Sequence, residues 1–337
     1  MGKMLPGIIL IIGVGVIVYL APWISGFFTS GSLANFGPNA SVFYVSDDAG
    51  SSFQQKSEGL MVNEIFDINF SSDQKMYLST SQGIFKFDNK KEWQRIKDST
   101  GILDFPSETR SLIWSKDGNA FLAINKNGHG KIYHSLDDLN NLTEVYVTSG
   151  ANSLIKDLEI NSVGRIYFLS SEKIFGYSDD NGKTFRLMAH LDKDFEKIVM
   201  DSNNNETIYL WGKNTIYKSI DGGHNFFNLG VTLVGINDLF VSNNHMIYLA
   251  TNKGVFQSFD GGWNWIIMDS LLPKDLAAGA VSYNNDGKEL LAGFDGRLYT
   301  SKDGTGWSVK TIGVNHINII KVNPFNSNEI LMGMKKQ

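Results

Sequence analysis

The chain has 337 residues and a formal charge of −5, with 42% hydrophobic, 12% aromatic and 19% charged residues. This apolar composition excludes a disordered chain, and the negative balance argues against a nucleic-acid-binding protein, which would carry a basic surface. Cysteine is absent, which excludes disulfides, thiolate metal sites and cysteine nucleophiles.

The segment from Leu5 to Phe28 contains no charged residue and exceeds the roughly 20 residues that a helix needs to cross a bilayer. We therefore predict an uncleaved signal anchor, a transmembrane helix, over residues 1–28. A cleaved signal peptide is the alternative, because Ser32 and Ala34 resemble a cleavage site, although they lie beyond the apolar run. A core helix of a soluble domain is disfavoured, since the segment is apolar on every face.

The basic residues predict the orientation of this anchor. Lys3 precedes the apolar segment, and the next basic residue is Lys56, so the N-terminus is expected in the cytoplasm. The rest of the chain is then exported, to the periplasm or the cell exterior. Residues 29–41 are rich in Ser, Gly and Asn and form a predicted linker, which spans at most about 45 Å when extended.

A repeat occupies the remainder of the sequence. Four segments fit the pattern Ser-x-Asp-x-Gly-x-x-aromatic, at residues 46–53, 178–185, 219–226 and 258–265. Three weaker copies lie at residues 86–93, 135–142 and 301–307, the last being one residue short. The seven starts are 39 to 49 residues apart, which is the length of one propeller blade.

Short alternating or apolar runs precede each motif, as in Ile166–Leu169 and Ile174–Phe175. Four such strands per repeat, separated by Asn, Asp and Gly turns, predict a four-stranded antiparallel blade with the motif between its third and fourth strands. The last repeat supplies only two strands, Ile317–Val322 and Glu329–Gly333, and the chain begins with a third strand at Val42. Residues 42–337 are thus predicted to form an all-β, seven-bladed β-propeller, closed by one blade that both termini share.

The motif is interpreted as a structural turn. The Asp carboxylate can accept backbone amides, the Gly supplies a positive φ, and the closing aromatic residue packs the turn onto its blade. A catalytic or calcium-binding role is disfavoured, because seven turns spaced around a ring cannot converge on one substrate. The predicted structural residues are Ser46, Asp48, Gly50, Phe53, Asp88, Trp93, Ser135, Asp137, Ser178, Asp180, Gly182, Phe185, Ser219, Asp221, Gly223, Phe226, Ser258, Asp260, Gly262, Trp265, Ser301, Asp303 and Trp307.

These motifs resemble the Asp-box, or bacterial neuraminidase (BNR) repeat, β-propellers over residues 42–337. The exported photosystem II assembly and stability factor-like propellers are the most similar in length and motif style, and their resemblance implies a noncatalytic scaffold. Sortilin-type receptors are similar in repeat style, but they carry a larger propeller and a cysteine-rich module. Xyloglucanase-type hydrolases place catalytic Asp residues between two tandem propellers, whereas one propeller is predicted here.

The resemblance to sialidases does not extend to their active site. That chemistry needs three arginines for a carboxylate, a Tyr–Glu pair and an acidic Asp. The chain has five arginines, and the strand assignment places only Arg110 and Arg297 near the face opposite the motif turns. No catalytic residue and no cofactor is predicted, and the six histidines show no metal-ligand spacing.

A partner is expected on the face opposite the motif turns, here called the loop face. Its longest connections are residues 97–109 and 269–279. The candidate partner-binding residues are Phe105, Arg110, His129, Leu271, Phe294 and Arg297. The linker enters at the start of a third strand, which also places the anchor at this face.

We therefore predict a noncatalytic, membrane-anchored, extracytoplasmic β-propeller that serves as an interaction scaffold or assembly factor for a membrane-associated protein. The alternative is a carbohydrate-binding or glycoside-hydrolase-like propeller that uses Trp, Tyr and carboxylate side chains on the loop face.

Overall fold

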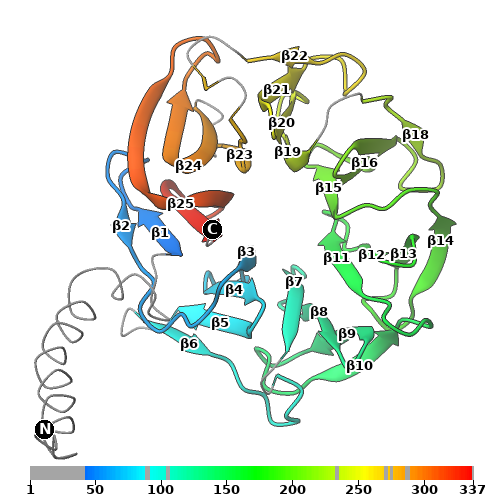
Figure 1. Ribbon diagram of the computed structural model, residues 1–337. Helices are drawn as coiled ribbons and strands as arrows, with labels where there is room; N and C mark the ends of the chain where they lie inside the picture. The colour runs from blue at the N-terminus through cyan, green and yellow to red at the C-terminus, as the bar shows by residue number, and fades with distance from the viewer. Residues whose placement is uncertain are drawn as a thin grey trace, which may run out of the picture. The chain divides into compact units, whose positions relative to one another are not determined.

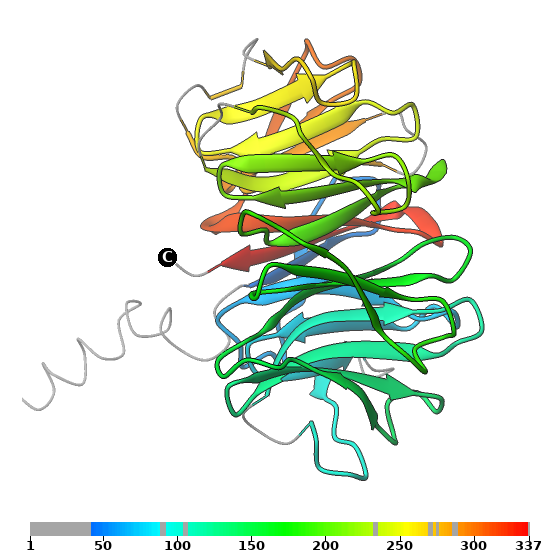
Figure 2. The same ribbon diagram turned by 90° about the vertical axis from the view of Figure 1, so that its right-hand side faces the viewer.

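The computed structural model describes residues 42–87, 92–103, 107–231, 235–268, 272–273, 276–284 and 289–335. All helix or strand structure in these residues is β-strand. The sheets lie around a common axis, each with one edge near the axis and the other at the rim (Figure 1). Viewed from the side, neighbouring sheets stack against each other (Figure 2). The described part of the chain is therefore an all-β propeller with antiparallel blades.

Five of the sheets have four antiparallel strands, which run in sequence order between the axis and the rim. The first sheet contains β3 (Ile65–Phe70), β4 (Met76–Thr80), β5 (Gly83–Phe87) and β6 (Trp93–Arg95). The second contains β7 (Glu108–Trp114), β8 (Ala120–Lys126), β9 (His129–Ser135) and β10 (Thr143–Val147). The third contains β11 (Ile155–Ile160), β12 (Ile166–Ser170), β13 (Ile174–Ser178) and β14 (Arg186–His190). The fourth contains β15 (Lys197–Asp201), β16 (Asn204–Gly212), β17 (Thr215–Ser219) and β18 (Phe227–Asn228). The fifth contains β19 (Ile236–Val241), β20 (Ile247–Thr251), β21 (Gly254–Ser258) and β22 (Ile266–Ile267).

The sixth sheet has six strands in the order β2-β1-β26-β25-β24-β23 and contains both ends of the described chain. Its strands are β1 (Phe43–Ser46), β2 (Gln54–Gln55), β23 (Ala280–Tyr283), β24 (Leu290–Ser301), β25 (Ser308–Asn323) and β26 (Asn326–Lys335). The expected pairing of the N-terminal and C-terminal strands is confirmed, because β1 pairs with β26 through Phe43–Gly333 and Ser46–Ile330.

The sequence predicts two separate strands where the structure has the single strand β25. Residues 308–311 of β25 pair with β24 and residues 317–323 pair with β26, while His316 pairs with both Asp295 of β24 and Lys335 of β26. The residues between the two pairings stay extended, so one strand serves two neighbours. Because β25 joins two groups of strands into one sheet, the described structure has six sheets, whereas seven separate blades were predicted.

Burial explains why the second strands are apolar runs. Every residue of β12 and of β20 is buried, because each of these strands is covered by a sheet on both faces. The outer strands behave differently: β10 and β14 have no buried residue and contain more polar side chains. Position between axis and rim thus sets the composition of each strand.

Hydrophobic clusters lie between neighbouring sheets rather than within one sheet. One cluster joins Phe175 of β13 to Ile198 and Leu210 of the next sheet. Another joins Phe43 of β1 to Ile65 and Trp93 of the first four-stranded sheet, so it spans the two ends of the ring. These contacts hold each sheet to the next.

Some sequence predictions concern residues outside the described ranges. These are the anchor and linker over residues 1–41, Asp88 of the second motif copy, and the loop residues Phe105 and Leu271. Among the residues that the structure does describe, no helix has the length and apolar character needed to cross a membrane.

We predict that removal of residues 318–337 lowers the melting temperature of the ring. The deletion removes β26, whose Ile330, Leu331, Met332 and Met334 are buried at 1% exposure or less. Each such side chain contributes about 1.5–3 kcal/mol through burial. In a domain of this size about 1 kcal/mol shifts the melting temperature by about 2–4 °C, so the loss should exceed about 10 °C. Calorimetry against a control lacking only residues 336–337 measures this; equal melting of the two chains would contradict closure by β26.

Candidate functional site: the axial channel and the loop face

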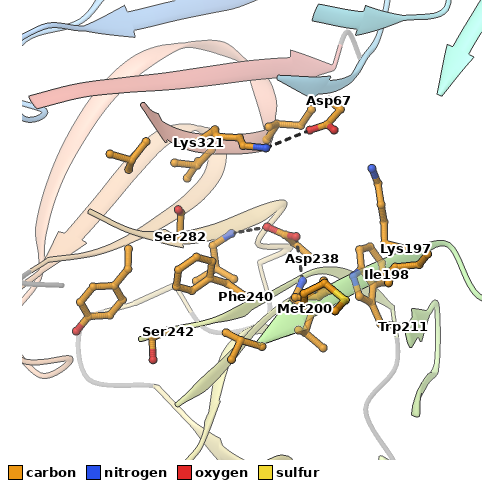
Figure 3. Close-up of a pocket in the computed structure, with 18 of the residues that line it drawn as sticks. Asp67, Lys197, Ile198, Met200, Trp211, Asp238, Phe240, Ser242, Ser282 and Lys321 are labelled. Carbon is orange, nitrogen blue, oxygen red and sulfur yellow. Dashed lines mark hydrogen bonds and ion pairs between the residues drawn. The ribbon is translucent and has the colours of Figure 1, made fainter. Parts of the chain in front are cut away.

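A cavity of about 1090 Å³ lies at the axis, between the innermost strands of the sheets. Its walls come from β3, β11, β15, β19, β23 and β25, with Trp211 of β16. The charged side chains on these walls are Glu64, Asp67, Asp157, Glu159, Lys197, Asp238 and Lys321. Figure 3 shows part of this wall, including the ion pair between Lys321 and Asp67. We call this cavity the axial channel.

Two aspartates of the axial channel bind the backbone of the next sheet. Asp157 Oδ2 accepts the amide of Ile198 at 2.9 Å, and Asp238 Oδ2 accepts the amide of Val281 at 3.0 Å. Asp238 Oδ1 also accepts the amide of Leu239 at 2.9 Å. The pairing register of β11 with β12, and of β19 with β20, shifts immediately before each aspartate. Such a bulge redirects a side chain, here toward the neighbouring innermost strand.

Two lysines provide positive charge in the axial channel. Lys197 Nζ lies 3.4 Å from Asp157 Oδ1, and Lys321 Nζ lies 3.7 Å from Asp67 Oδ1. Burial alone would lower the pKa of Lys197, but nearby acids, chiefly the carboxylates of Asp157 and Asp67, outweigh it and raise that pKa. Lys197 is therefore charged at neutral pH.

Glu159 differs from the other acids of the axial channel. No hydrogen bond or ion pair joins its carboxyl group to the described residues. Desolvation in the channel, followed by the nearby Asp157 charge, raises the pKa of Glu159 to about 8. Burial likewise raises the pKa of Asp238 to about 6, against the opposing effect of its amide donors.

The motif turns form a repeated hydrogen-bond network. In the copy at residues 258–265, Ser258 Oγ donates to Asp260 Oδ1 at 2.9 Å and accepts the Gly262 amide at 2.8 Å. Asp260 Oδ1 also accepts the amides of Trp263 and Asn264. The copies that begin at Ser46, Ser135, Ser178 and Ser219 make the corresponding Ser–Asp and Ser–amide bonds.

These bonds stabilise the ionised aspartates. Hydrogen bonds from the residue four positions later lower the pKa to about 2 for Asp48, Asp180, Asp221 and Asp260. Hydrogen bonds from the backbone amides of Gly306 and Thr305 lower the pKa of Asp303 to about 2. Hydrogen bonds from the backbone and side chain of Asn141 lower the pKa of Asp137. The aspartate oxygens are thus occupied by their own turns.

Two of the weaker copies, at residues 135–142 and 301–307, form the turn with altered details. Leu139 occupies the glycine position of the copy at residues 135–142 and adopts a φ of 69° while its side chain is fully buried. In the short copy, the backbone amide of Gly304 donates a hydrogen bond to Ser301 Oγ at 2.9 Å. In the second copy Lys86 replaces Ser and pairs with Asp138 of the next turn at 2.8 Å.

The turns contact the preceding sheet as well as their own. A Cβ atom added at Gly182, where φ is 76°, would lie 2.2 Å from Phe121 Cε1 of the preceding sheet. The ring of Phe226 packs at 5.1 Å, edge to face, against Phe175 of the preceding sheet. The closing residues Phe53, Trp93, Phe185, Trp265 and Trp307 also join the hydrophobic clusters. The prediction that each turn packs onto its own blade is therefore incomplete: the turns also join neighbouring sheets.

On the loop face, the candidate residues do not form one cluster. Arg110 lies over the ring of Phe66 at 4.3 Å, across two sheets, and pairs with Glu108. His129 is partly buried, and its Nδ1 has no partner among the described residues. Arg297 is exposed on β24, in a different sheet. No contact joins these three side chains in the described part of the chain.

Phe294 was wrongly predicted as a partner-binding residue. Its ring is 1% exposed and packs against Tyr299 at 5.1 Å within a hydrophobic cluster. Leu103 and Leu272, which lie in the two long connections of the loop face, are also buried. The backbone amide of Leu103 donates a hydrogen bond to Asp98 Oδ1, and Arg95 donates one to the carbonyl of Leu103. These apolar side chains complete the core between sheets.

The axial acids were not singled out from the sequence, although a signal was present. Asp67, Asp157 and Asp238 recur at matching places in the innermost strands, each directly followed by a buried Ile or Leu. A charged residue repeated within buried strands indicates a shared structural or binding role. Among the described residues, no group of three or more His, Asp or Glu side chains has the geometry to hold a metal ion.

No protein-family model matches the sequence, and comparison with curated protein sequences finds no match. Solved structures are similar in fold. YCF48 bound to a D1 peptide has a TM-score of 0.65 at 11% identity, over 81% of this chain and 92% of that one. YCF48 from Cyanidioschyzon merolae has a TM-score of 0.60 at 14% identity, over 81% and 96%.

A hydrolase is also similar in fold. The GH74 enzyme of Niastella koreensis has a TM-score of 0.63 at 18% identity, over 81% of this chain. The similar region is 51% of the enzyme, so this chain spans about half of its length. At these identities the comparisons establish a propeller fold.

We predict that Ser219→Ala lowers the free energy of unfolding by about 1–3 kcal/mol. Ser219 is fully buried, and its loss leaves the Gly223 amide, now bonded at 2.9 Å, without an acceptor. Denaturant unfolding measures the change. Ser51→Ala is the control, because Ser51 is exposed and its hydroxyl makes no hydrogen bond among the described residues. Equal stability of the two variants would show that the turn does not depend on this serine.

We also predict that the motif aspartates make the protein acid-sensitive below pH 4. Their folded pKa values, about 2 for Asp260, lie below the ordinary value of 3.8. Their stabilisation is therefore complete above about pH 4 and is lost as the pH falls toward 2. Melting temperatures measured from pH 5 to pH 2 should fall less steeply for Asp260→Asn than for the unmodified chain. Parallel curves would count against this role.

Proposed function

We propose that this chain is a noncatalytic interaction scaffold or assembly factor that binds a membrane-associated protein. The observation that carries the proposal is the role of the axial aspartates. Both Asp157 and Asp238 accept backbone amides of the next innermost strand, so they are engaged in holding sheets together. Glycoside hydrolysis requires a pair of carboxyl groups directed at the substrate.

The arginines support the same proposal. None of the described residues that line the axial channel is an arginine. Arg95 donates to the carbonyls of Gln82 and Leu103, and Arg165 pairs with Asp179. A sialidase-like arginine triad would require three of these side chains at one site.

We further propose that the propeller has seven blades built on Asp-box repeats. The six-stranded sheet would count as two blades, with β25 contributing to both. A hydrophobic cluster that includes Leu291 and Leu298 of β24 and Ile317, Met332 and Tyr44 of the other half supports this division. It would lie between two blades, as the other clusters lie between sheets.

The peptide-bound YCF48 structure supports a protein partner, since nearly the whole of that propeller is similar to this one. The partner would bind the loop face near Arg110, which Phe66 and Glu108 hold in place. The apolar segment 5–28 would anchor the chain in a membrane, with the propeller on the periplasmic or extracellular side. The linker would keep the loop face within about 45 Å of the bilayer.

A glycoside-hydrolase-like activity is the second candidate. One observation favours it: Glu159, with a pKa of about 8, is a protonated carboxyl group in a channel that also contains the Asp67 carboxylate. A raised pKa is typical of the general acid in such enzymes. In this case Glu159→Gln would abolish hydrolysis of a glycan substrate.

We predict that the full chain sediments with membranes and, after detergent extraction, captures a stoichiometric membrane protein. Arg110→Glu should reduce this capture about tenfold or more, because it reverses a charge at the proposed binding face. Arg186→Glu is the matched control, since Arg186 is exposed on the outer strand β14. Quantitative mass spectrometry of the captured material measures the effect.

A glycan array run with the same preparation provides the opposing result. A saccharide ligand, or hydrolysis that Glu159→Gln abolishes, together with no stoichiometric protein partner, would contradict the scaffold and favour the second candidate.

A further inference from the structure

Of the ionisable side chains that line the axial channel, Glu159 is the one without a hydrogen-bond or ion-pair partner among the described residues. The other acids of the wall are paired: Glu64 with Lys335, Asp67 with Lys321, and Asp157 with Lys197. Asp238 is bonded to two amides. One carboxyl group is therefore available to a ligand.

The charges around Glu159 favour a cation. Asp157 lies on the same strand, Asp67 on β3 and Asp238 on β19, while Lys197 on β15 and Lys321 on β25 are positive. Four carboxyl groups thus face two ammonium groups. Both ammonium groups already have carboxylate partners, so an anionic ligand would have to break an existing pair. A cationic ligand would instead form a new ion pair with Glu159.

Another wall atom that lacks a partner is an acceptor that a cation could satisfy. Asn318 Oδ1, in the same wall, is a buried acceptor without a donor. The aromatic rings of Phe66, Phe240 and Tyr283 also line the channel, and aromatic faces attract cations.

We propose that the axial channel binds the ammonium or guanidinium group of a Lys or Arg side chain that the protein partner presents, with Glu159 as its counter-ion. This inference rests on the proposed function, because the side chain belongs to that partner. The cavity of about 1090 Å³ exceeds what one side chain fills, so the flanking backbone of the partner enters with it. A cation bound beside Glu159 favours its carboxylate form, so binding lowers the raised pKa of Glu159.

Isothermal titration of the full chain in detergent tests the proposal. The probes are Nα-acetyl-lysine amide and Nα-acetyl-arginine amide, in which only the side chain is charged. At pH 7 we expect binding with release of a proton, seen as a heat that depends on the ionisation enthalpy of the buffer. Nα-acetyl-norleucine amide and Nα-acetyl-glutamate amide should not bind.

The variant E159Q should weaken binding of the cationic probes about tenfold or more and eliminate the proton release. E58Q is the matched control, since Glu58 is exposed and lies outside the channel wall. Thermal melting checks that both variants fold. The proton release of the unmodified chain tests the proposal independently of any variant.

Several results would overturn the inference: no binding of either cationic probe, equal affinity of E159Q, or preferred binding of the glutamate probe. Spermidine is titrated in the same way, and much tighter binding of spermidine would assign the channel to a free polyamine rather than a side chain. Capture of a membrane protein that E159Q leaves unchanged would overturn this inference and leave the proposed function standing. Absence of any captured protein would contradict the proposed function itself.

Discussion

The packing between neighbouring sheets is the interaction on which the rest of this structure depends. Each sheet is too small to bury its own apolar faces, and the second strands are buried because a sheet lies on both sides. The motif turns add to this contact, as Phe226 does against Phe175 and Gly182 against Phe121. Because every sheet needs two neighbours, the ring must close, and the pairing of β1 with β26 closes it.

Closure also determines the chemistry at the axis. The innermost strands cannot pack directly against one another across the centre, so they line a channel. Asp157 and Asp238 use that position to bind backbone amides of the next strand, and the lysines neutralise part of the charge. Glu159 is left with a carboxyl group that the described structure does not use. The same geometry that holds the ring therefore produces its candidate binding site.

Much of the fold could be predicted from the sequence, because the repeat fixes strand order and the motif fixes one turn per repeat. The pairing of both chain ends and the Ser258–Asp260 bonds follow from that pattern. Other features depend on three-dimensional context. Phe294 is buried because a neighbouring sheet covers it, and Leu139 takes the positive φ of the glycine position in its turn while its side chain packs in the core. The role of Asp238 depends on a bulge and on its neighbour in the ring, neither of which is local in sequence.

A double-mutant cycle on Phe175 and Phe226 tests most directly whether contacts between sheets hold the ring. The two rings lie 5.1 Å apart, edge to face, in adjacent sheets. Unfolding free energies of Phe175→Leu, Phe226→Leu and the double variant should give a coupling energy of about 0.5–1.5 kcal/mol. The same cycle on Phe175 and the distant Phe85 should give no coupling energy. Additive effects of Phe175 and Phe226, within about 0.3 kcal/mol, would contradict the account.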